Sequence, residues 1–76
     1  MEGLGQSDFD AVKIWLNGEE KEVDAENITA LINTLGLPSP ALLVEHNGLA
    51  LRRDEWELRV LEAGDRVEII RIVAGG

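Results

Sequence analysis

"VKIWLNGEEKEV", residues 12–23, decides the fold, because it contains the pattern of a strand, a tight turn and a second strand. Its first five residues alternate with the period of a β-strand, and Trp15 lies on the side opposite Ile14 and Leu16. Asn17-Gly18 follows, and this dipeptide is the strongest short hairpin signal because both residues tolerate a positive φ. We therefore expect a β-hairpin whose second strand returns antiparallel to the first.

The next segment, "ENITALINTLGLP" (26–38), changes to the period of a helix. Its apolar residues form one stripe at i, i+3, i+4 and i+7: Ile28, Leu31, Ile32 and Leu35. Asn27 is a suitable N-cap, and Gly36 suits the left-handed position after the last turn, so that Leu37 can fold back on the stripe. Such a helix, about 12 Å long, is too short to be stable alone, so we expect it to pack on a sheet.

Three further strands are expected after the helix. They run from Leu42 to His46, over a short stretch after the Asn47-Gly48 turn, and from Val67 onward after a Gly64-Asp65 turn. A polar turn is expected around Asp54, with Trp56 at the edge of the core. The order β-β-α-β-β-β predicts an α+β domain of two layers, in which one main helix packs on one face of a mixed four- or five-stranded sheet. The simplest closure places the first and last strands side by side and parallel at the centre. We expect a flexible leader over residues 1–10, the folded domain over 11–73 and a flexible tail over 74–76.

Composition excludes several classes of function. The 76-residue chain has no cysteine and a single histidine, His46, so it offers neither a disulfide nor a cysteine nucleophile nor a zinc site of histidine and cysteine. No motif surrounds either serine, so we expect no enzyme activity and no bound metal. The net charge of −8 disfavours nucleic acid and anionic membranes as partners and favours steering toward a basic cleft on another protein. No apolar run is long enough to span a bilayer and no signal peptide is visible, so a cytoplasmic location is expected.

The last strand carries apolar residues on both of its sides, although one short helix can cover only one face of a sheet. Val67 and Ile69 share one side, whereas Ile70 and Ile72 share the other. Either a bulge switches the parity of the strand, or the far face exposes an apolar patch. Trp15 favours the patch, in which it would cluster with Ile70 and Ile72 as a partner site. The alternative is local shielding of this face by the leader.

His46 falls on the same side of its strand as Leu42 and Val44. A lone histidine on an apolar strand face is more often a residue of the core edge than a ligand, and we expect that role here.

Several of these segments together resemble the β-grasp sulfur carrier proteins, and most of all the ThiS type of thiamine thiazole biosynthesis. The resemblance rests on "VKIWLNGE", the "LGL" helix exit, "VEHNG", "RDEW", "EAGDRVEII" and the final Gly-Gly, in this order and spacing. It runs from about residue 12 to residue 76 and implies a ubiquitin-like β-grasp fold. The chain departs from the pattern in its longer leader, in Ala74 where a further glycine is frequent, and in His46 where a small aliphatic residue is usual.

The resemblance implies chemistry at the end of the chain. An activating enzyme of the E1 type adenylates the carboxylate of Gly76 with ATP, and sulfur from a persulfide then gives a thiocarboxylate. That group donates sulfur to thiazole synthase or another acceptor enzyme, and the chain itself is a co-substrate that binds no cofactor and is a monomer when free. Glycine at Gly75 and Gly76 places no side chain beside the reacting carbonyl. We expect the partner-binding surface to comprise Trp15, Ile70, Arg71, Ile72 and Ala74, with Arg71 at the root of the tail.

Other functions remain open from the sequence. Related carriers serve molybdopterin and cysteine synthesis and transfer-RNA thiolation. A ubiquitin-like modifier would share the adenylation but form isopeptides, and a plain β-grasp binding domain would not need its terminal glycines.

Overall fold

The computed structural model describes residues 11–37 and 41–72, in which one α-helix packs against a five-stranded sheet. The elements in chain order are β1 (Val12–Leu16), β2 (Glu19–Val23), α1 (Ile28–Leu35), β3 (Leu42–His46), β4 (Leu49–Leu51), the 3-10 helix η2 (Arg53–Leu58) and β5 (Arg66–Arg71). The predicted order of strands and helix is therefore confirmed.

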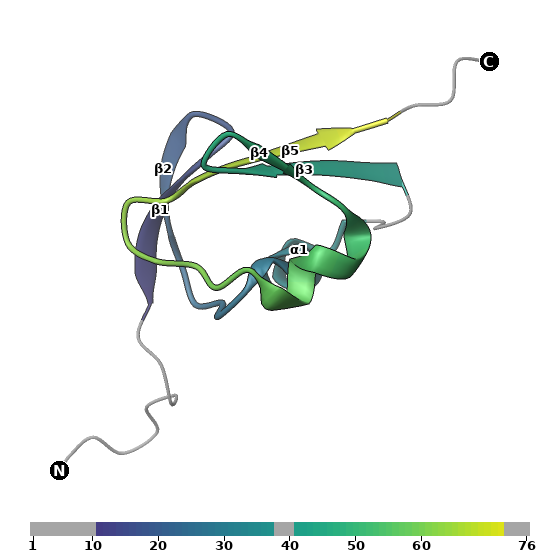
Figure 1. Ribbon diagram of the computed structural model, residues 1–76. Helices are drawn as coiled ribbons and strands as arrows, with labels where there is room; N and C mark the ends of the chain where they lie inside the picture. Colours follow the sequence, from purple (N-terminus) through teal and green to yellow (C-terminus); the bar gives the residue numbers. More distant parts are fainter. Residues whose placement is uncertain (1–10, 38–40, 73–76) are drawn as a thin grey trace, which may run out of the picture.

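The sheet has the strand order β2-β1-β5-β3-β4, with β5 in the middle. β1 and β5 are parallel neighbours, and all other pairs are antiparallel. The predicted closure, with the first and last strands parallel and adjacent, is thus confirmed. In Figure 1 the strands curve along one side of the molecule and α1 faces the side that they enclose.

Two Asn-Gly turns join the antiparallel strand pairs, and they have nearly the same conformation. Asn17 and Gly18 have φ of 51° and 82°, and Asn47 and Gly48 have φ of 52° and 85°. Positive φ at both central residues is the type I′ geometry, whose twist matches that of the flanking strands. The local sequence signal therefore fixes both hairpins.

Helix α1 begins and ends where its caps predict. The Asn27 side chain accepts a 2.8 Å hydrogen bond from the backbone N–H of Ala30, and Gly36 adopts the left-handed conformation with φ of 70°. Leu35 was expected in the buried stripe but is 39% exposed. Leu37, which the turn at Gly36 returns toward the helix, packs against the core at this end instead.

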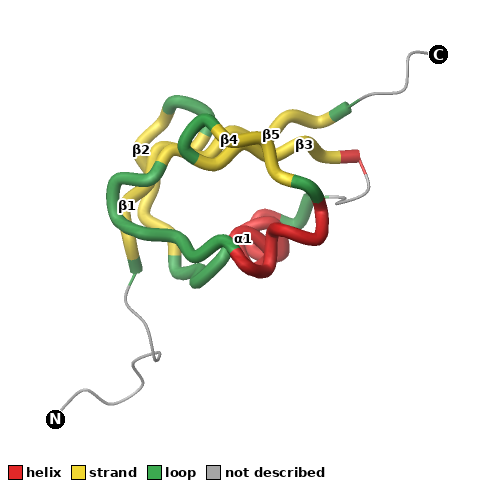
Figure 2. Tube along the Cα trace, in the orientation of Figure 1, coloured by secondary structure: helices red, strands yellow, loops and turns green. Residues whose placement is uncertain are grey.

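The segment after β4 differs from its prediction. A polar turn was expected around Asp54, but the chain forms the 3-10 helix η2, which Figure 2 shows in red beside α1. Glu55 caps its start by accepting a 2.7 Å hydrogen bond from the backbone N–H of Arg52. The Arg53 guanidinium lies 5.3 Å from the centroid of the Trp56 ring. Trp56 is buried between the sheet and α1, and this packing favours a helical turn in the segment. Because the packing involves distant parts of the chain, the local sequence of residues 53–58 does not predict it.

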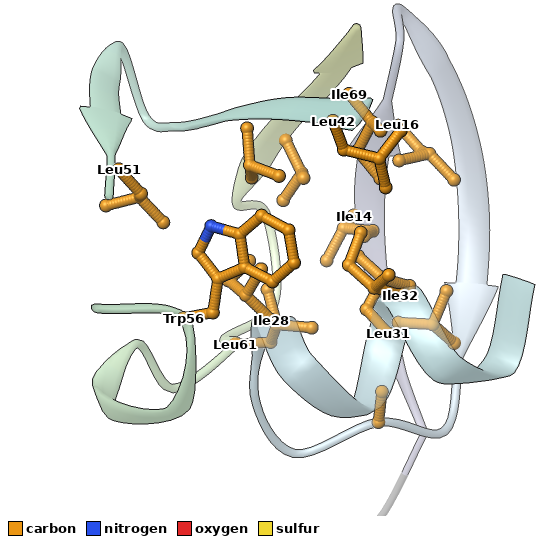
Figure 3. Close-up of a cluster of buried hydrophobic side chains, with 14 residues drawn as sticks. Ile14, Leu16, Ile28, Leu31, Ile32, Leu42, Leu51, Trp56, Leu61 and Ile69 are labelled. Carbon is orange, nitrogen blue, oxygen red and sulfur yellow. The ribbon is translucent and has the colours of Figure 1, made fainter. Parts of the chain in front are cut away.

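The core lies between the sheet and the two helices. Trp56, which was expected at the edge of the core, is 5% exposed, and its ring occupies the middle of the cluster drawn in Figure 3. Ile14, Ile28 and Val67, from three different elements, are completely buried. No helix in the described ranges has the length and apolar character needed to span a bilayer.

Candidate functional site

The predicted site residues fall into two groups. Trp15, Ile70, Arg71 and Ile72 belong to the described part of the chain, whereas Ala74, Gly75 and Gly76 lie outside the described residues. Among the described residues, the hydrogen bond nearest the C-terminus joins the backbone N–H of Ile72 to the carbonyl oxygen of Ala41 at 2.7 Å. Pairing beside β3 therefore holds the chain in place up to Ile72, two positions before the predicted tail begins.

The sheet has an open face, on the side away from α1, and β5 exposes apolar residues on it. The register between β3 and β5 is unbroken from Leu42–Arg71 to His46–Val67, so no bulge switches the parity of β5. Ile70 is 47% and Ile72 is 50% exposed. The exposed apolar patch predicted from the alternation is thus confirmed, and the bulge is excluded.

Trp15 does not belong to this patch, which corrects the predicted cluster of Trp15, Ile70 and Ile72. In the β1–β5 register Trp15 lies beside Arg66, four residues before Ile70. Four residues of strand span about 13 Å, too far for contact between the side chains. Trp15 is 44% exposed and borders a hollow that it shares with Gly18, Arg66 and Glu68.

Leu43 takes the place that sequence reasoning gave to Trp15. It lies directly opposite Ile70 in the register of β3 and β5 and is 50% exposed. Side chains opposite each other on one face have Cβ atoms about 4.5–5.5 Å apart and pack together. The apolar patch therefore consists of Leu43, Ile70 and Ile72. Alternation along Leu42–His46 places Leu43 on the outer face, but it does not show which strand lies beside it.

Arg71 lies on the other side of β5, opposite Leu42 on the face that carries the core. Its side chain is exposed. Arg71 thus stands at the root of the tail, as expected, but it faces away from the apolar patch.

A partly buried polar network surrounds His46 and was not predicted. His46 is 4% exposed, which confirms its place at the core edge. The Arg59 Nε–H donates to His46 Nδ1 at 3.2 Å, so the ring carries its proton on Nε2 and donates it to Asp65 Oδ2 at 2.7 Å. The network joins the end of β3, the chain after η2 and the turn before β5. Its members are 13 and 19 residues from His46, so no local pattern reveals them.

Asp65 accepts two further hydrogen bonds, from the backbone N–H of Glu62 at 2.9 Å and from the Asn47 side chain at 3.1 Å. Partial burial pushes the pKa of Asp65 upward, but the hydrogen bonds from His46, Glu62 and Asn47 outweigh it and hold the pKa below its usual value. The carboxylate thus closes a turn that positions β5. Among residues 11–37 and 41–72, no group of three or more His, Cys, Asp or Glu residues is suited to hold a metal ion.

Comparison with known families and proteins agrees with these features. The ThiS family model matches residues 14–76. The chain is 30% identical over 67 residues to the "Uncharacterized protein ycf40" of Trieres chinensis, covering 87% of this chain and 92% of that protein. It is also 30% identical over 66 residues to a thiazole synthase of Paramagnetospirillum magneticum, covering 86% of this chain but only 20% of the synthase.

Solved structures show the same fold. The crystal structure of the thiamine biosynthesis protein ThiS from Geobacter metallireducens is 32% identical, with a TM-score of 0.74 over 86% of this chain and the whole of that one. The solution structure of a thiamine biosynthesis protein from the same organism gives a TM-score of 0.71 at 29% identity, over 86% of this chain and 88% of that one. The predicted ubiquitin-like β-grasp fold is confirmed. The chain belongs to the ThiS family, as its resemblance to the β-grasp sulfur carriers predicts.

Proposed function

We propose that this protein carries sulfur for the thiazole of thiamine, as a thiocarboxylate on the carboxyl group of Gly76. The observation that carries the proposal is the family match, which extends through the Gly75-Gly76 pair to residue 76. The similarity to a solved thiamine biosynthesis protein supports the pathway. The similarity to one fifth of a thiazole synthase also supports the pathway, because it suggests that a carrier of this kind acts together with that enzyme.

The proposed chemistry begins with activation of a poor electrophile. A Gly76 carboxylate oxygen attacks the α-phosphorus of ATP, pyrophosphate leaves, and an acyl-adenylate forms on an activating enzyme. The terminal sulfur of a persulfide then attacks the carbonyl carbon and AMP leaves. A thiol cleaves the resulting sulfur–sulfur bond, so that one sulfur stays on Gly76 as the thiocarboxylate. The protein is in this scheme a co-substrate rather than an enzyme, and it binds no cofactor itself.

The absence of other chemistry on the chain supports this scheme. The sequence contains no cysteine, so sulfur has no thiol to which it can be attached. The single histidine is buried and both of its ring nitrogens are used in hydrogen bonds, which leaves it unsuited to general acid–base work on a substrate. A thiocarboxylate at a terminal glycine requires neither group. In this scheme the activating enzyme binds the ATP. A cytoplasmic location, where ATP is abundant, stays a prediction.

The test is intact mass spectrometry of the full chain. The protein is incubated with the activating enzyme of its own organism, ATP and a persulfide donor. We expect the mass to change by the replacement of one oxygen by sulfur, and fragmentation to place the sulfur on Gly76. The untreated mass shows at the same time whether Gly76 ends the mature chain, which the proposal requires. An unchanged mass would contradict it, and isopeptide conjugates on other proteins would identify a modifier instead.

A further inference from the structure

His46 is a buried ionisable side chain that the proposed chemistry does not use. It is the last residue of β3, and its ring lies between a cation and an anion. The Arg59 Nε–H donates to Nδ1 at 3.2 Å, and Nε2–H donates to Asp65 Oδ2 at 2.7 Å. The ring therefore connects the chain after η2 with the turn before β5, but only while Nδ1 carries no proton.

A protonated ring is compatible with only one of these two bonds. An imidazolium has an N–H group at both nitrogens, so Nδ1 changes from an acceptor to a donor. The Arg59 guanidinium has donors only and does not lose its charge, so that donor would face donor and cation would face cation across 3.2 Å. The bond to Asp65, in contrast, becomes charged on both sides and is strengthened.

The elements packed around the ring bring few other charges to it. Leu49 of β4 and Val67 of β5 lie opposite His46 in the sheet, and neither ionises. Helix α1 contains no ionisable side chain, and η2 contributes only its apolar last residue to the hollow beside the ring. Among the described residues that line this hollow, the ionisable groups besides the three members of the network are limited to Glu62, whose side chain is exposed.

The anion of the network keeps its charge at mildly acidic pH. Partial burial pushes the pKa of Asp65 upward, but its hydrogen bonds hold the pKa below the usual value. Histidine is the side chain whose charge ordinarily changes between about pH 5 and pH 8. Over that range, therefore, a proton from the solvent has one place in the network to bind, which is Nδ1 of His46.

Arg59 joins the ring to both helices. Its backbone N–H donates to the carbonyl oxygen of Trp56 in η2 at 3.4 Å. Its carbonyl oxygen accepts a 3.2 Å hydrogen bond from the N–H of Ile28, the first residue of α1. Of these bonds, the one from the Arg59 side chain is the one that reaches β3. A change at His46 can thus be felt at the start of α1.

Little apolar packing holds the chain around Arg59. Its neighbours Leu58 and Val60 are 76% and 60% exposed, the largest values among the large apolar side chains of residues 11–37 and 41–72. Segments with few buried apolar contacts open at low free energy. The Arg59 side chain is half-buried and borders the open hollow, which gives it a path to solvent. Loss of the bond to His46 should therefore loosen residues 58–60 without unfolding the domain.

We infer that His46 is a pH-sensitive link between β3 and residues 58–60. Near neutral pH the ring accepts from Arg59 and donates to Asp65. When acidification adds a proton at Nδ1, Arg59 is released and Asp65 alone holds the imidazolium. The released stretch then opens more often and exposes the Ile28 N–H at the start of α1. The inference concerns the folded domain itself and does not depend on the proposed function.

NMR spectroscopy of the full chain between about pH 7.5 and pH 5 tests the link. The nitrogen signals of the His46 ring report its protonation, and the Arg59 Nε–H signal reports the bond between them. We expect both signals to change with one midpoint. The protection factor of the Ile28 N–H against hydrogen exchange should fall about fivefold over this range. The Gly36 N–H, which is bonded to the Ile32 carbonyl oxygen at the other end of α1, is the internal reference and should keep its protection.

Two variants remove the pH dependence in different ways. His46→Gln keeps an acceptor and a donor on one uncharged amide, so it can bind Arg59 and Asp65 at every pH. Arg59→Gln removes the cation, and its amide can turn either its oxygen or its N–H toward the ring, so the contact survives protonation. In both variants we expect the Ile28 protection factor to change less than about twofold. Melting curves at neutral pH check that each variant is folded, and the wild-type titration decides the inference even without them.

Three results would overturn the inference. The first is a His46 ring that becomes protonated while the Arg59 Nε–H signal and the Ile28 protection factor stay unchanged. The second is a ring that stays neutral down to about pH 5. The third is an equal loss of Ile28 protection in His46→Gln, because another group would then cause the change.

Discussion

Asn17 accepts a 2.8 Å hydrogen bond from the backbone N–H of Ile69, which lies 52 residues further along the chain. The same asparagine occupies the left-handed position of the first hairpin turn. Asn47 repeats the arrangement in the second turn, where its side-chain oxygen accepts a 2.8 Å hydrogen bond from the backbone N–H of Arg66. Each turn asparagine therefore forms its hairpin and also fixes the position of β5 at the centre of the sheet.

The two roles of Asn17 can be separated by substitution. Asn17→Gly keeps a residue suited to the left-handed turn but leaves the Ile69 N–H without its acceptor, and we expect a loss of about 1–3 kcal/mol in the free energy of unfolding. Asn17→Asp keeps both the turn conformation and an acceptor, so its loss is expected to be smaller. Urea unfolding followed by circular dichroism measures both. Equal stability of Asn17→Gly and the wild type would show that the hydrogen bond contributes nothing.

Asp65 predicts a pH dependence of stability. Its pKa is lower in the folded protein than its usual value, so its contribution is fully present above the unfolded pKa of about 3.9 and is lost as the pH falls through the folded pKa. At neutral pH we expect Asp65→Asn to lower the free energy of unfolding by about 1.5–3 kcal/mol, because it removes hydrogen bonds to a charged acceptor. Asparagine resembles the protonated acid, so the difference between variant and wild type should shrink below the folded pKa.

Urea unfolding of both proteins at a series of pH values checks this. Glu62→Gln is the control, because Glu62 contributes its backbone N–H to Asp65 and its side chain is exposed. A difference between wild type and Asp65→Asn that stays constant down to the most acidic pH would contradict the assignment.

Truncation of the two tryptophans is expected to lower the free energy of unfolding by very different amounts. Trp56 is 5% exposed in the centre of the core. Trp56→Ala should lower the free energy of unfolding by about 3–5 kcal/mol, which is enough to leave most molecules of a domain this small unfolded. Trp15 is 44% exposed on the open face, and Trp15→Ala should change the free energy of unfolding by about 0.5 kcal/mol or less. Thermal unfolding followed by circular dichroism compares them. A large loss in Trp15→Ala would show that this side chain supports the sheet.

Features that a short stretch of chain encodes could be predicted from the sequence. Both hairpins follow from Asn-Gly pairs, and α1 begins and ends at Asn27 and Gly36 because these residues satisfy its terminal backbone groups within a few positions. Alternation also assigned Ile70 and Ile72 correctly to the exposed side of β5.

Features set by the register between distant strands could not be predicted in the same way. Alternation gives the face of Trp15 but not its position along β5, which is fixed by bonds such as that from the Trp15 N–H to the Asp65 carbonyl oxygen at 2.8 Å. Alternation alone therefore groups Trp15 with Ile70, although the residue that lies opposite Ile70 is Leu43. The Arg59–His46–Asp65 network was missed for the same reason, because it forms only when three distant segments meet.

The end of the chain gives the last prediction. If Gly76 is the site of adenylation, a variant that lacks Gly75 and Gly76 should acquire no sulfur when it is incubated with the activating enzyme, ATP and a persulfide donor. Ala74→Gly is the matched control, because it introduces the glycine that is frequent in this family and keeps the length of the tail. It is expected to acquire sulfur like the wild type, since a glycine there adds no side chain to the path of the tail. Both variants keep the folded domain, so a truncated carrier that still binds the enzyme and blocks sulfur transfer to the wild type would separate recognition of the domain from chemistry at the terminus. Sulfur on the truncated chain would place the reacting group elsewhere and refute the role of Gly76.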